Sequence, residues 1–216
     1  MKVTLDACLF AARVNFHHPE QLLDIGAGTG LLSLFLAQRY PHMHITALEI
    51  EAAASAECAL NFANSPFSPR LHSVCCDIRE FTPANTFRNI ICNPPFFTSG
   101  SSSGNTQRAQ ARHAYGLPLA ELLQHITRLL HKEGEAWLLL GEEALLEVNS
   151  LLPQHGLYLN ARINLQARAD KPIHRSFVKL SFVPGTCANE HLLAYAQNTE
   201  YSQAARDLLS PFFIKL

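Results

Sequence analysis

Short apolar runs alternate with longer amphipathic stretches along this chain of 216 residues, and no other feature restricts its fold as strongly. Each run has the length of a buried strand, whereas the stretches between the runs carry apolar residues at helical spacing. This alternation predicts βαβ units, and therefore a mostly parallel sheet with helices on both of its faces. The runs interpreted as the first five strands are Gln21–Ile25, Ile45–Glu49, Leu71–Cys76, Ile90–Cys92 and Glu135–Leu140.

The remaining segments complete the predicted order of elements. Leu157–Gln166 and Arg175–Val183 are predicted strands with no helix between them, so we expect them to pair in an antiparallel manner. Thr98–Gln107 is rich in serine and glycine, and we expect a loop that acts as a substrate lid. The turn His131–Gly134 is expected to precede the fifth strand. The predicted helices are Leu31–Gln38, Ala52–Asn64, Leu119–Leu130, Glu142–Leu152 and Ser202–Leu209.

The composition narrows the class of protein. Hydrophobic residues make up 48% of the chain and charged residues 16%, which is typical of a globular domain and not of a disordered segment. The six cysteines show no CxxC pair and no Cys/His spacing typical of zinc, so we expect reduced thiols and no metal. No apolar run approaches the roughly 20 residues that span a bilayer, and the start lacks the order of a signal peptide. We therefore expect a cytoplasmic monomer without membrane contact.

A glycine turn joins the first predicted strand to the first predicted helix. In Leu23–Gly30 the glycines let the backbone turn tightly, and the helix that follows offers free N–H groups to a ligand. The spacing is G-x-G-x-G and differs from the G-x-G-x-x-G of dinucleotide sites, which binds a pyrophosphate. Because such a turn suits an adenosine-methionine ligand, we predict a site for S-adenosylmethionine. Its residues in this segment are Asp24, Gly26, Gly28 and Gly30.

Two further acidic residues follow predicted strands and are expected at the same edge of the sheet, where ligands of open α/β folds bind. Glu49 ends the second strand, about 20 residues after the glycine turn, where a carboxylate can accept both ribose hydroxyls. Asp77 follows the third strand and can accept the exocyclic amine of the cofactor adenine, beside the apolar side chain of Ile78. The structural alternatives are a solvated strand end for Glu49 and a cap of a helix or turn for Asp77.

Asn93-Pro94-Pro95-Phe96 follows the fourth predicted strand and is the candidate catalytic motif. Two consecutive prolines fix the backbone and remove two N–H donors, so carbonyl oxygens point in preset directions. The Asn93 side-chain oxygen and the Pro94 carbonyl can then accept both hydrogens of one planar –NH₂ group. These contacts favour a pyramidal nitrogen whose lone pair points at a methyl carbon, and Phe96 can stack on a base or amide plane. The motif predicts methylation of a planar nitrogen, with Asn93 also bordering the cofactor.

At these residues the chain resembles the class I N-methyltransferases that carry an Asn/Asp-Pro-Pro-aromatic motif, and within them the bacterial tRNA(Val) adenosine-37 N6-methyltransferases. The similarity covers nearly the whole sequence. It implies a Rossmann-like α/β fold of one domain, residues 1–216, whose seven-stranded sheet ends in an antiparallel strand. It also implies S-adenosylmethionine as cofactor, tRNA as partner and N6 of adenine as the acceptor. Segments that narrow the resemblance are Gln110–His113, Lys171–Arg175 and Tyr201–Phe213.

The resemblance assigns roles to single residues as well. The start Met1–Asp6 is similar to the family's cofactor-contacting Lys-Val-x-x-Asp segment, which implies that Lys2 and Asp6 contact the cofactor. A tRNA base must leave its stack to reach Asn93. Because the net charge is only −1, RNA contact would depend on a localised basic surface. The residues expected to bind substrate are Phe96, Arg112, His113 and Arg175, with Arg108, Lys171 and His174 as further candidates for phosphate contact.

Other acceptors remain open on the same chemistry, namely guanine N2 in rRNA, glutamine N5 in a protein and adenine N6 in DNA. The DNA and protein-glutamine enzymes usually carry an additional domain, for which 216 residues leave little room. A non-catalytic binding module that keeps only the fold is the alternative from a different class. The intact glycine turn together with Glu49, Asp77 and Asn93 argues against such a module.

Overall fold

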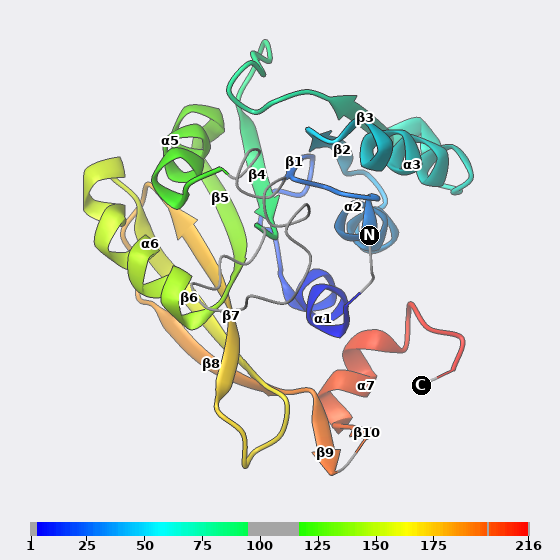
Figure 1. Cartoon of the computed structure of the whole chain (residues 1–216), viewed down its shortest axis with the longest axis vertical. Helices are drawn as coiled ribbons and strands as arrows, with labels where there is room; N and C mark the ends of the chain where they lie inside the picture. The colour runs from blue at the N-terminus through cyan, green and yellow to red at the C-terminus, as the bar shows by residue number, and fades with distance from the viewer. Residues whose placement is uncertain (1–3, 95–116, 198, 216) are drawn as a thin grey trace, which may run out of the picture.

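The computed structural model describes residues 4–94, 117–197 and 199–215. Its centre is an eight-stranded sheet with the order β3-β2-β1-β4-β5-β7-β6-β8, and Figure 1 shows helices on either side of this sheet. All neighbouring strands pair in parallel except at β7, which is antiparallel to both β5 and β6. The strands are β1 Gln21–Ile25, β2 His44–Glu49, β3 Leu71–Cys75, β4 Phe87–Cys92, β5 Leu130–Leu140, β6 Tyr158–Gln166, β7 Ile173–Ser181 and β8 Ala188–Leu193.

Helices cover both faces of the sheet and bury an apolar layer against each. Phe177 and Val178, which are consecutive in β7, show the two layers, because successive strand residues point to opposite faces. Phe177 packs against Phe10 of α1 at a ring distance of 5.1 Å, in the layer under α1, α2, α3 and α7. Val178 lies in the layer under α5 and α6. The helices are α1 Leu5–Arg13, α2 Leu31–Arg39, α3 Ala52–Ala63, α5 Leu119–Leu129, α6 Glu142–His155 and α7 Gln203–Leu209.

The predicted class and most predicted elements are confirmed, but the sheet has one strand more than the expected seven. The expected antiparallel strand is β7, and the additional strand is β8, which pairs with β6 at the edge of the sheet. The first four residues of β8 are exposed. An edge strand has only one neighbour and needs no continuous apolar run, so its sequence gave no strand signal. A small ribbon of β9 Tyr195–Gln197 and β10 Glu200–Tyr201 follows it.

The turn predicted at His131–Gly134 is also wrong, because these residues belong to β5. Phe87 of β4 pairs with Leu130 and Asn89 pairs with Glu135, so the four residues between lie opposite Arg88 alone. A Cβ added at Gly134 would lie 2.7 Å from the Arg88 carbonyl oxygen. The glycine therefore permits a bulge in which the two backbones approach closely, and the strand continues through the segment.

Helix α1 was not predicted from the sequence. Its cap is Thr4, whose Oγ1 accepts a hydrogen bond from the Ala7 N–H at 3.3 Å. Asp6 in the first turn and Arg13 in the last turn match the helix dipole. Every residue from Ala7 to Ala12 is buried, so the helix has no amphipathic pattern that would distinguish it in the sequence.

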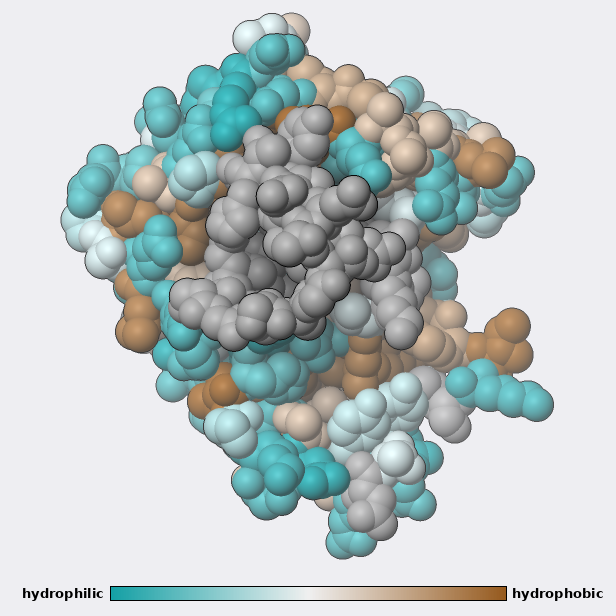
Figure 2. Space-filling model, in the orientation of Figure 1, coloured by the Kyte–Doolittle hydropathy of each residue, from teal (hydrophilic) through white to brown (hydrophobic). Residues whose placement is uncertain are grey.

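The surface of the described chain is mixed in character on the face that is seen. On the face in Figure 2, hydrophobic residues of the described chain are dispersed among hydrophilic ones. None of the helices that the structure describes is long and apolar enough to cross a membrane.

Candidate functional site

Four parallel strands end side by side at one edge of the sheet, which we call the carboxyl edge. The pairing of β3, β2, β1 and β4 aligns their last residues. With neighbouring strands about 4.8 Å apart, the edge from β3 to β4 spans roughly 14 Å. The strand order reverses between β1 and β4, which is where open α/β sheets form a ligand crevice. From β3 to β4, the residues along this edge are Asp77, Glu49, the glycine turn Gly26–Gly30 and Asn93.

The glycine turn between β1 and α2 requires its glycines. Gly26, Gly28 and Gly30 have φ values of 69°, 58° and 86°, a left-handed region that side chains with a Cβ rarely adopt. The Gly26 N–H donates to the Leu48 carbonyl of β2 at 2.9 Å, which ties the turn to the neighbouring strand. At Gly30 a Cβ would lie 2.6 Å from Cε1 of Phe62, so the side of the turn toward α3 has no room for a side chain.

Asp24 lies inside β1, one residue before its end, and is fully buried. Its Oδ2 accepts a hydrogen bond from the Ser33 hydroxyl of α2 at 2.7 Å. Its Oδ1 is buried and has no hydrogen-bond partner within the described chain. Burial raises the pKa of this carboxyl to about 7, although the hydrogen bonds with Ser33 act in the opposite direction. The carboxylate thus joins β1 to α2, and its contact with a cofactor ammonium stays a prediction.

Glu49, at the end of β2, holds the glycine turn in place. Its Oε2 accepts from the Gly28 N–H at 2.7 Å, and its Oε1 accepts from the Glu51 N–H at 2.9 Å. Glu49 is therefore more than a solvated strand end. Because each carboxylate oxygen can accept more than one hydrogen bond, both oxygens retain capacity for ribose hydroxyls.

Asp77 has the geometry of a turn cap, which was the structural alternative to its predicted role in binding the cofactor adenine. Its Oδ1 accepts from the Arg79 N–H and its Oδ2 from Arg79 Nη1, each at 2.9 Å. Partial burial opposes ionisation, but the hydrogen bonds from Arg79 outweigh it and keep the pKa of Asp77 below its ordinary value. The neighbouring Ile78 is only 7% exposed and packs in the apolar layer with α5 and α6. Its predicted contact with the cofactor would use the small part of the side chain that remains exposed.

Asn93 directly follows β4 and borders the glycine turn of β1, the neighbouring strand. Its Oδ1 is buried and accepts no hydrogen bond from the described residues. Pro94, which follows, is buried. A buried polar atom without a partner costs about 1–3 kcal/mol, so a ligand that donates a hydrogen here would be stabilised by that amount or more.

Asp6 and Arg175, predicted for the cofactor and the substrate, lie together. The Asp6 carboxylate is 3.3 Å from His174 Nε2 and 3.7 Å from Arg175 Nε. These contacts join α1 to the start of β7. A Cβ at Gly141, just after β5, would lie 3.6 Å from Arg175 Nη1, so the cluster is also at the carboxyl edge. The predicted residues Lys2, Pro95, Phe96, Arg112 and His113, the candidate Arg108 and the segment Thr98–Gln107 lie outside the described residues.

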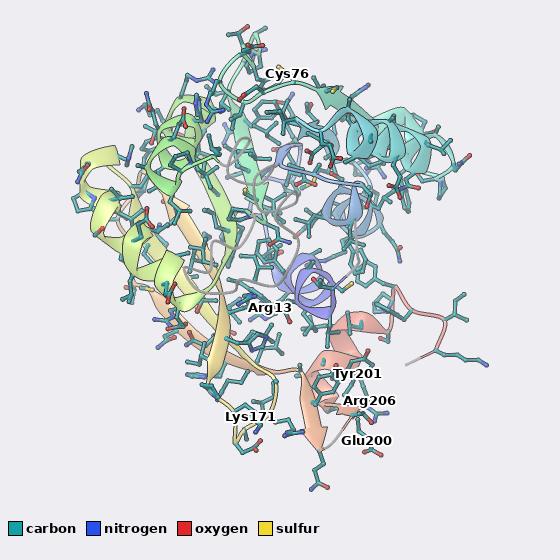
Figure 3. The ribbon with its side chains drawn as sticks, in the orientation of Figure 1. Arg13, Cys76, Lys171, Glu200, Tyr201 and Arg206 are labelled. Carbon is teal, nitrogen blue, oxygen red and sulfur yellow. The ribbon has the colours of Figure 1, made fainter. Side chains whose placement is uncertain are left out.

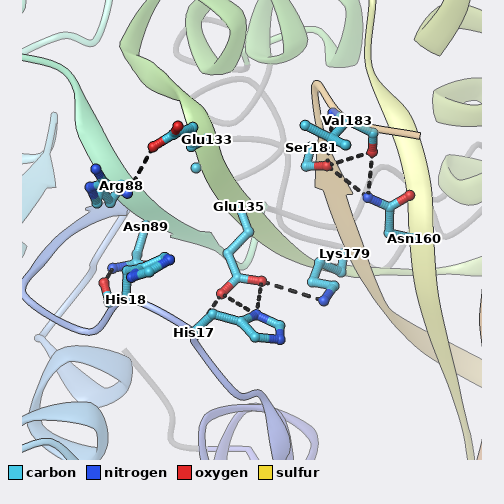
Figure 4. A pocket seen from close by; sticks show the side chains of 11 residues that line it. His17, His18, Arg88, Asn89, Glu133, Glu135, Asn160, Lys179, Ser181 and Val183 are labelled. Atoms are coloured by element: carbon cyan, nitrogen blue, oxygen red, sulfur yellow. Dashed lines mark hydrogen bonds and ion pairs between the residues drawn. The ribbon is translucent and has the colours of Figure 1, made fainter. Parts of the chain in front are cut away.

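A cavity of about 290 Å³ lies at the opposite edge of the sheet, where β1 and β4 begin and β7 ends (Figure 4). In it, Glu135 accepts from the His17 backbone N–H at 2.7 Å and lies 3.4 Å from Lys179 Nζ. Arg88 pairs with Glu133 at 3.3 Å. The charged groups that line this amino edge therefore pair among themselves, and we assign no cofactor to it.

The residues of the carboxyl edge fit S-adenosylmethionine. A Cβ added at Gly26 would meet no heavy atom within 4 Å, so open space lies against the turn. Hydrogen-bond acceptors lie on both sides of the glycine turn along this edge. Glu49 and Asp77 lie toward β3, and Asn93 lies toward β4. Among the described residues, no group of three or more His, Cys, Asp or Glu side chains is placed to hold a metal ion.

Some residues of the site could not be found from the sequence. Ser33 donates a hydrogen bond to Asp24, which lies nine positions earlier in the sequence. Glu121 accepts one from Arg79, which lies 42 positions earlier. Neither belongs to a motif, and the pairs form only because α2 and α5 pack beside the strand ends. His174 had been considered for RNA contact, but its pairing with Asp6 joins residues that are 168 positions apart.

Comparisons with known proteins agree with this geometry. Residues 4–152 match the family model of the methyltransferase small domain. The chain is 40% identical to the tRNA1(Val) (adenine(37)-N6)-methyltransferase of Vibrio vulnificus strain YJ016, covering 100% of this chain and 90% of that protein. It is 34% identical to the enzyme of the same name from Shewanella frigidimarina, covering 100% and 94%.

Solved structures support the fold. A predicted O-methyltransferase from Agrobacterium tumefaciens matches with a TM-score of 0.74 at 17% identity, covering 95% of each chain. A glycopeptide N-methyltransferase, solved with S-adenosylmethionine, matches with a TM-score of 0.60 at 13% identity, covering 82% of this chain and 93% of that one. The chain belongs to the methyltransferase small domain family and, within it, to the bacterial tRNA1(Val) (adenine(37)-N6)-methyltransferases, which confirms the family expected from the motifs.

Proposed function

We propose that this protein methylates N6 of adenosine 37 in tRNA1(Val), with S-adenosylmethionine as the methyl donor. The observation that carries the proposal is Asn93 Oδ1, a buried acceptor without a described partner, placed beside the glycine turn. The names of the curated relatives, at 32–40% identity over the whole chain, support the choice of substrate.

The cofactor would be held by the row of residues along the carboxyl edge. S-adenosylmethionine, when bound, supplies a methyl group on a positively charged sulfur. Glu49 would accept hydrogen bonds from the ribose, and Asp77 would accept one from the adenine amine. The glycine turn lets the backbone approach the ligand because no Cβ intervenes. Together these contacts would direct the methyl group toward the end of β4.

Asn93 would activate the acceptor. The exocyclic amine of adenine is a poor nucleophile because its lone pair is delocalised into the ring. Asn93 Oδ1 would accept one amine hydrogen and the Pro94 carbonyl the other, which favours a pyramidal nitrogen with a localised lone pair. Once methylated, the cationic nitrogen releases its proton easily, so no strong base is required before attack.

A basic and aromatic surface would receive the RNA around the site. The target base must be turned out of its stack, and Arg175 lies at the same edge of the sheet as Asn93. Figure 3 shows Lys171 on the hairpin between β6 and β7, with Tyr201 and Arg206 nearby around β9, β10 and α7. Tyr195 and Tyr201 stack with their rings 5.4 Å apart. These groups could contact phosphates and bases, as RNA-binding surfaces do.

The test is methyl transfer to a transcript of tRNA1(Val), with a labelled methyl group on the cofactor and nucleoside analysis of the product. We expect N6-methyladenosine, and no label in a matched transcript in which guanosine replaces adenosine 37. N2-methylguanosine or labelled protein, without N6-methyladenosine, would overturn the proposal.

A further inference from the structure

Arg79 joins the loop after β3, residues Asp77–Phe81, to helix α5. Its Nη1 and backbone N–H hold the two oxygens of Asp77, each at 2.9 Å. Its Nε and Nη2 hold the two carboxylate oxygens of Glu121, on α5, at 2.8 and 2.9 Å. One guanidinium therefore bridges two carboxylates, and the pairing with Glu121 has the two-point geometry that only arginine provides.

A second arginine of α5 fixes the same loop. Arg128 Nη2 donates to the Ile78 carbonyl and Nη1 to the Phe81 carbonyl, each at 2.9 Å. Glu121 and Arg128 are seven residues apart, and this spacing places them two turns apart on one side of the helix. The loop from Asp77 to Phe81 is thus tied to α5 at both ends. In Figure 1, the connection from β3 to β4 crosses the top of the view, toward α5.

The arrangement acts on Asp77, the predicted acceptor of the amine of the cofactor adenine. A carboxylate only accepts hydrogen bonds, so an ionised Asp77 binds an exocyclic amine and rejects a carbonyl at the same ring position. The guanidinium of Arg79 opposes protonation of Asp77 and fixes its χ angles. Arg79 itself would touch neither the cofactor nor the RNA, so its role is to position Asp77.

We propose that Arg79, held by Glu121, is a positioning residue that makes the cofactor site selective for adenine over its deaminated form, hypoxanthine. This inference rests on the proposed function, because it takes Asp77 as the acceptor of the adenine amine. Loss of a hydrogen bond to a charged group weakens binding by roughly tenfold or more, which sets the size of the expected preference. The carboxylate that distinguishes an amine from a carbonyl at this ring position is thus held by α5 through Arg79.

The experiment is calorimetric titration of the full chain with S-adenosylhomocysteine and with its inosine analogue. We expect the wild type to bind the adenine form at least tenfold more tightly. Arg79→Gln and Glu121→Gln should each reduce this preference several-fold, and Arg79→Lys should give an intermediate value because it keeps one charge. With tRNA as acceptor, the KM for S-adenosylmethionine should rise in Arg79→Gln while kcat changes less than twofold.

Arg88→Gln is the matched control, since it removes an arginine from an exposed ion pair at the amino edge. It should leave the preference for adenine unchanged. A lower melting temperature of Arg79→Gln and Glu121→Gln with an unchanged preference would reduce Arg79 to a structural role and overturn the inference. Equal binding of both ligands by the wild type would also overturn it, whereas absence of tRNA methylation with a persisting preference would contradict the proposed function alone.

Discussion

The two edges of the central sheet carry different kinds of polar residues. Both contain an asparagine whose side-chain oxygen is buried and has no hydrogen-bond partner among the described residues, Asn93 at the carboxyl edge and Asn89 at the amino edge. Asn89 uses its amide nitrogen to bind the carbonyls of His18 and Gln21, at 2.6 and 2.8 Å, so it fastens the chain before β1. The amino edge also contains the cavity of about 290 Å³, whose charged groups pair with one another.

The comparison shows that the two edges use their polar residues differently, and strand direction indicates the carboxyl edge as the candidate site. At the carboxyl edge, a glycine turn and several hydrogen-bond acceptors follow the ends of neighbouring strands, because these strands share a direction. At the amino edge, polar groups are used to hold the fold together. A catalytic role for Asn93 and a structural role for Asn89 are therefore separable by experiment.

The largest effect is expected at Asn93. Asn93→Ala should lower turnover about 10²–10³-fold, since it removes a preorganised acceptor of the reacting amine. Affinity for S-adenosylhomocysteine and the melting temperature should change little, because Oδ1 has no partner in the described protein. Asn89→Ala should do the reverse and lower the melting temperature while keeping turnover per folded molecule. Equal loss of turnover in both variants would contradict the distinction between the edges.

Gly30→Ala should destabilise the protein by about 3 kcal/mol, as the sum of a left-handed alanine and an overpacked contact with Phe62. Gly156→Ala is the control, since Gly156 has a φ of 62° but open space around a Cβ. It should cost only about 1 kcal/mol, for the left-handed backbone alone. Denaturant unfolding measures both values, and similar costs at the two positions would refute the steric role of the carboxyl-edge turn.

Asp24→Asn should alter the pH dependence of stability. The pKa of Asp24 is raised to about 7 in the folded protein, so the folded state holds this proton at a higher pH than the unfolded state does. The contribution of Asp24 to the free energy of unfolding is therefore fully present at low pH and is lost as the pH rises from about 4 to 7. Between pH 5 and pH 8 the wild type should lose on the order of 2 kcal/mol more than Asp24→Asn. Parallel curves of unfolding free energy against pH would show that Asp24 does not titrate in this range.

Lys179→Met should have the smallest effect on turnover. Lys179 lines the amino-edge cavity, and its loss leaves Glu135 with the His17 backbone N–H as a partner. Because the ion pair of Lys179 with Glu135 is largely buried, we expect a loss of unfolding free energy of about 3 kcal/mol and a turnover within twofold of the wild type. A large loss of turnover would show that the amino edge contributes to function after all.

The sequence was most informative for residues whose position follows from the neighbouring strand in the sequence. The glycine turn, Glu49 and Asn93 could be placed because each directly follows or ends a strand, and strands of one direction share an edge. Helix α1 and strand β8 escaped prediction for opposite reasons, the first because it is buried almost all round and the second because it is largely exposed. Neither pattern has the alternation on which prediction from sequence depends.

The sequence by itself determined the α/β class, the glycine turn, the acidic strand ends and the candidate catalytic motif, because residues within a few positions of one another specify them. Only the tertiary structure decided which distant groups support them. Asp77 is held by Arg79 and Glu121, Asp24 by Ser33, and Asp6 by a cluster at β7. Such pairs form when helices pack beside strand ends, and long-range packing leaves no periodic signal in the sequence.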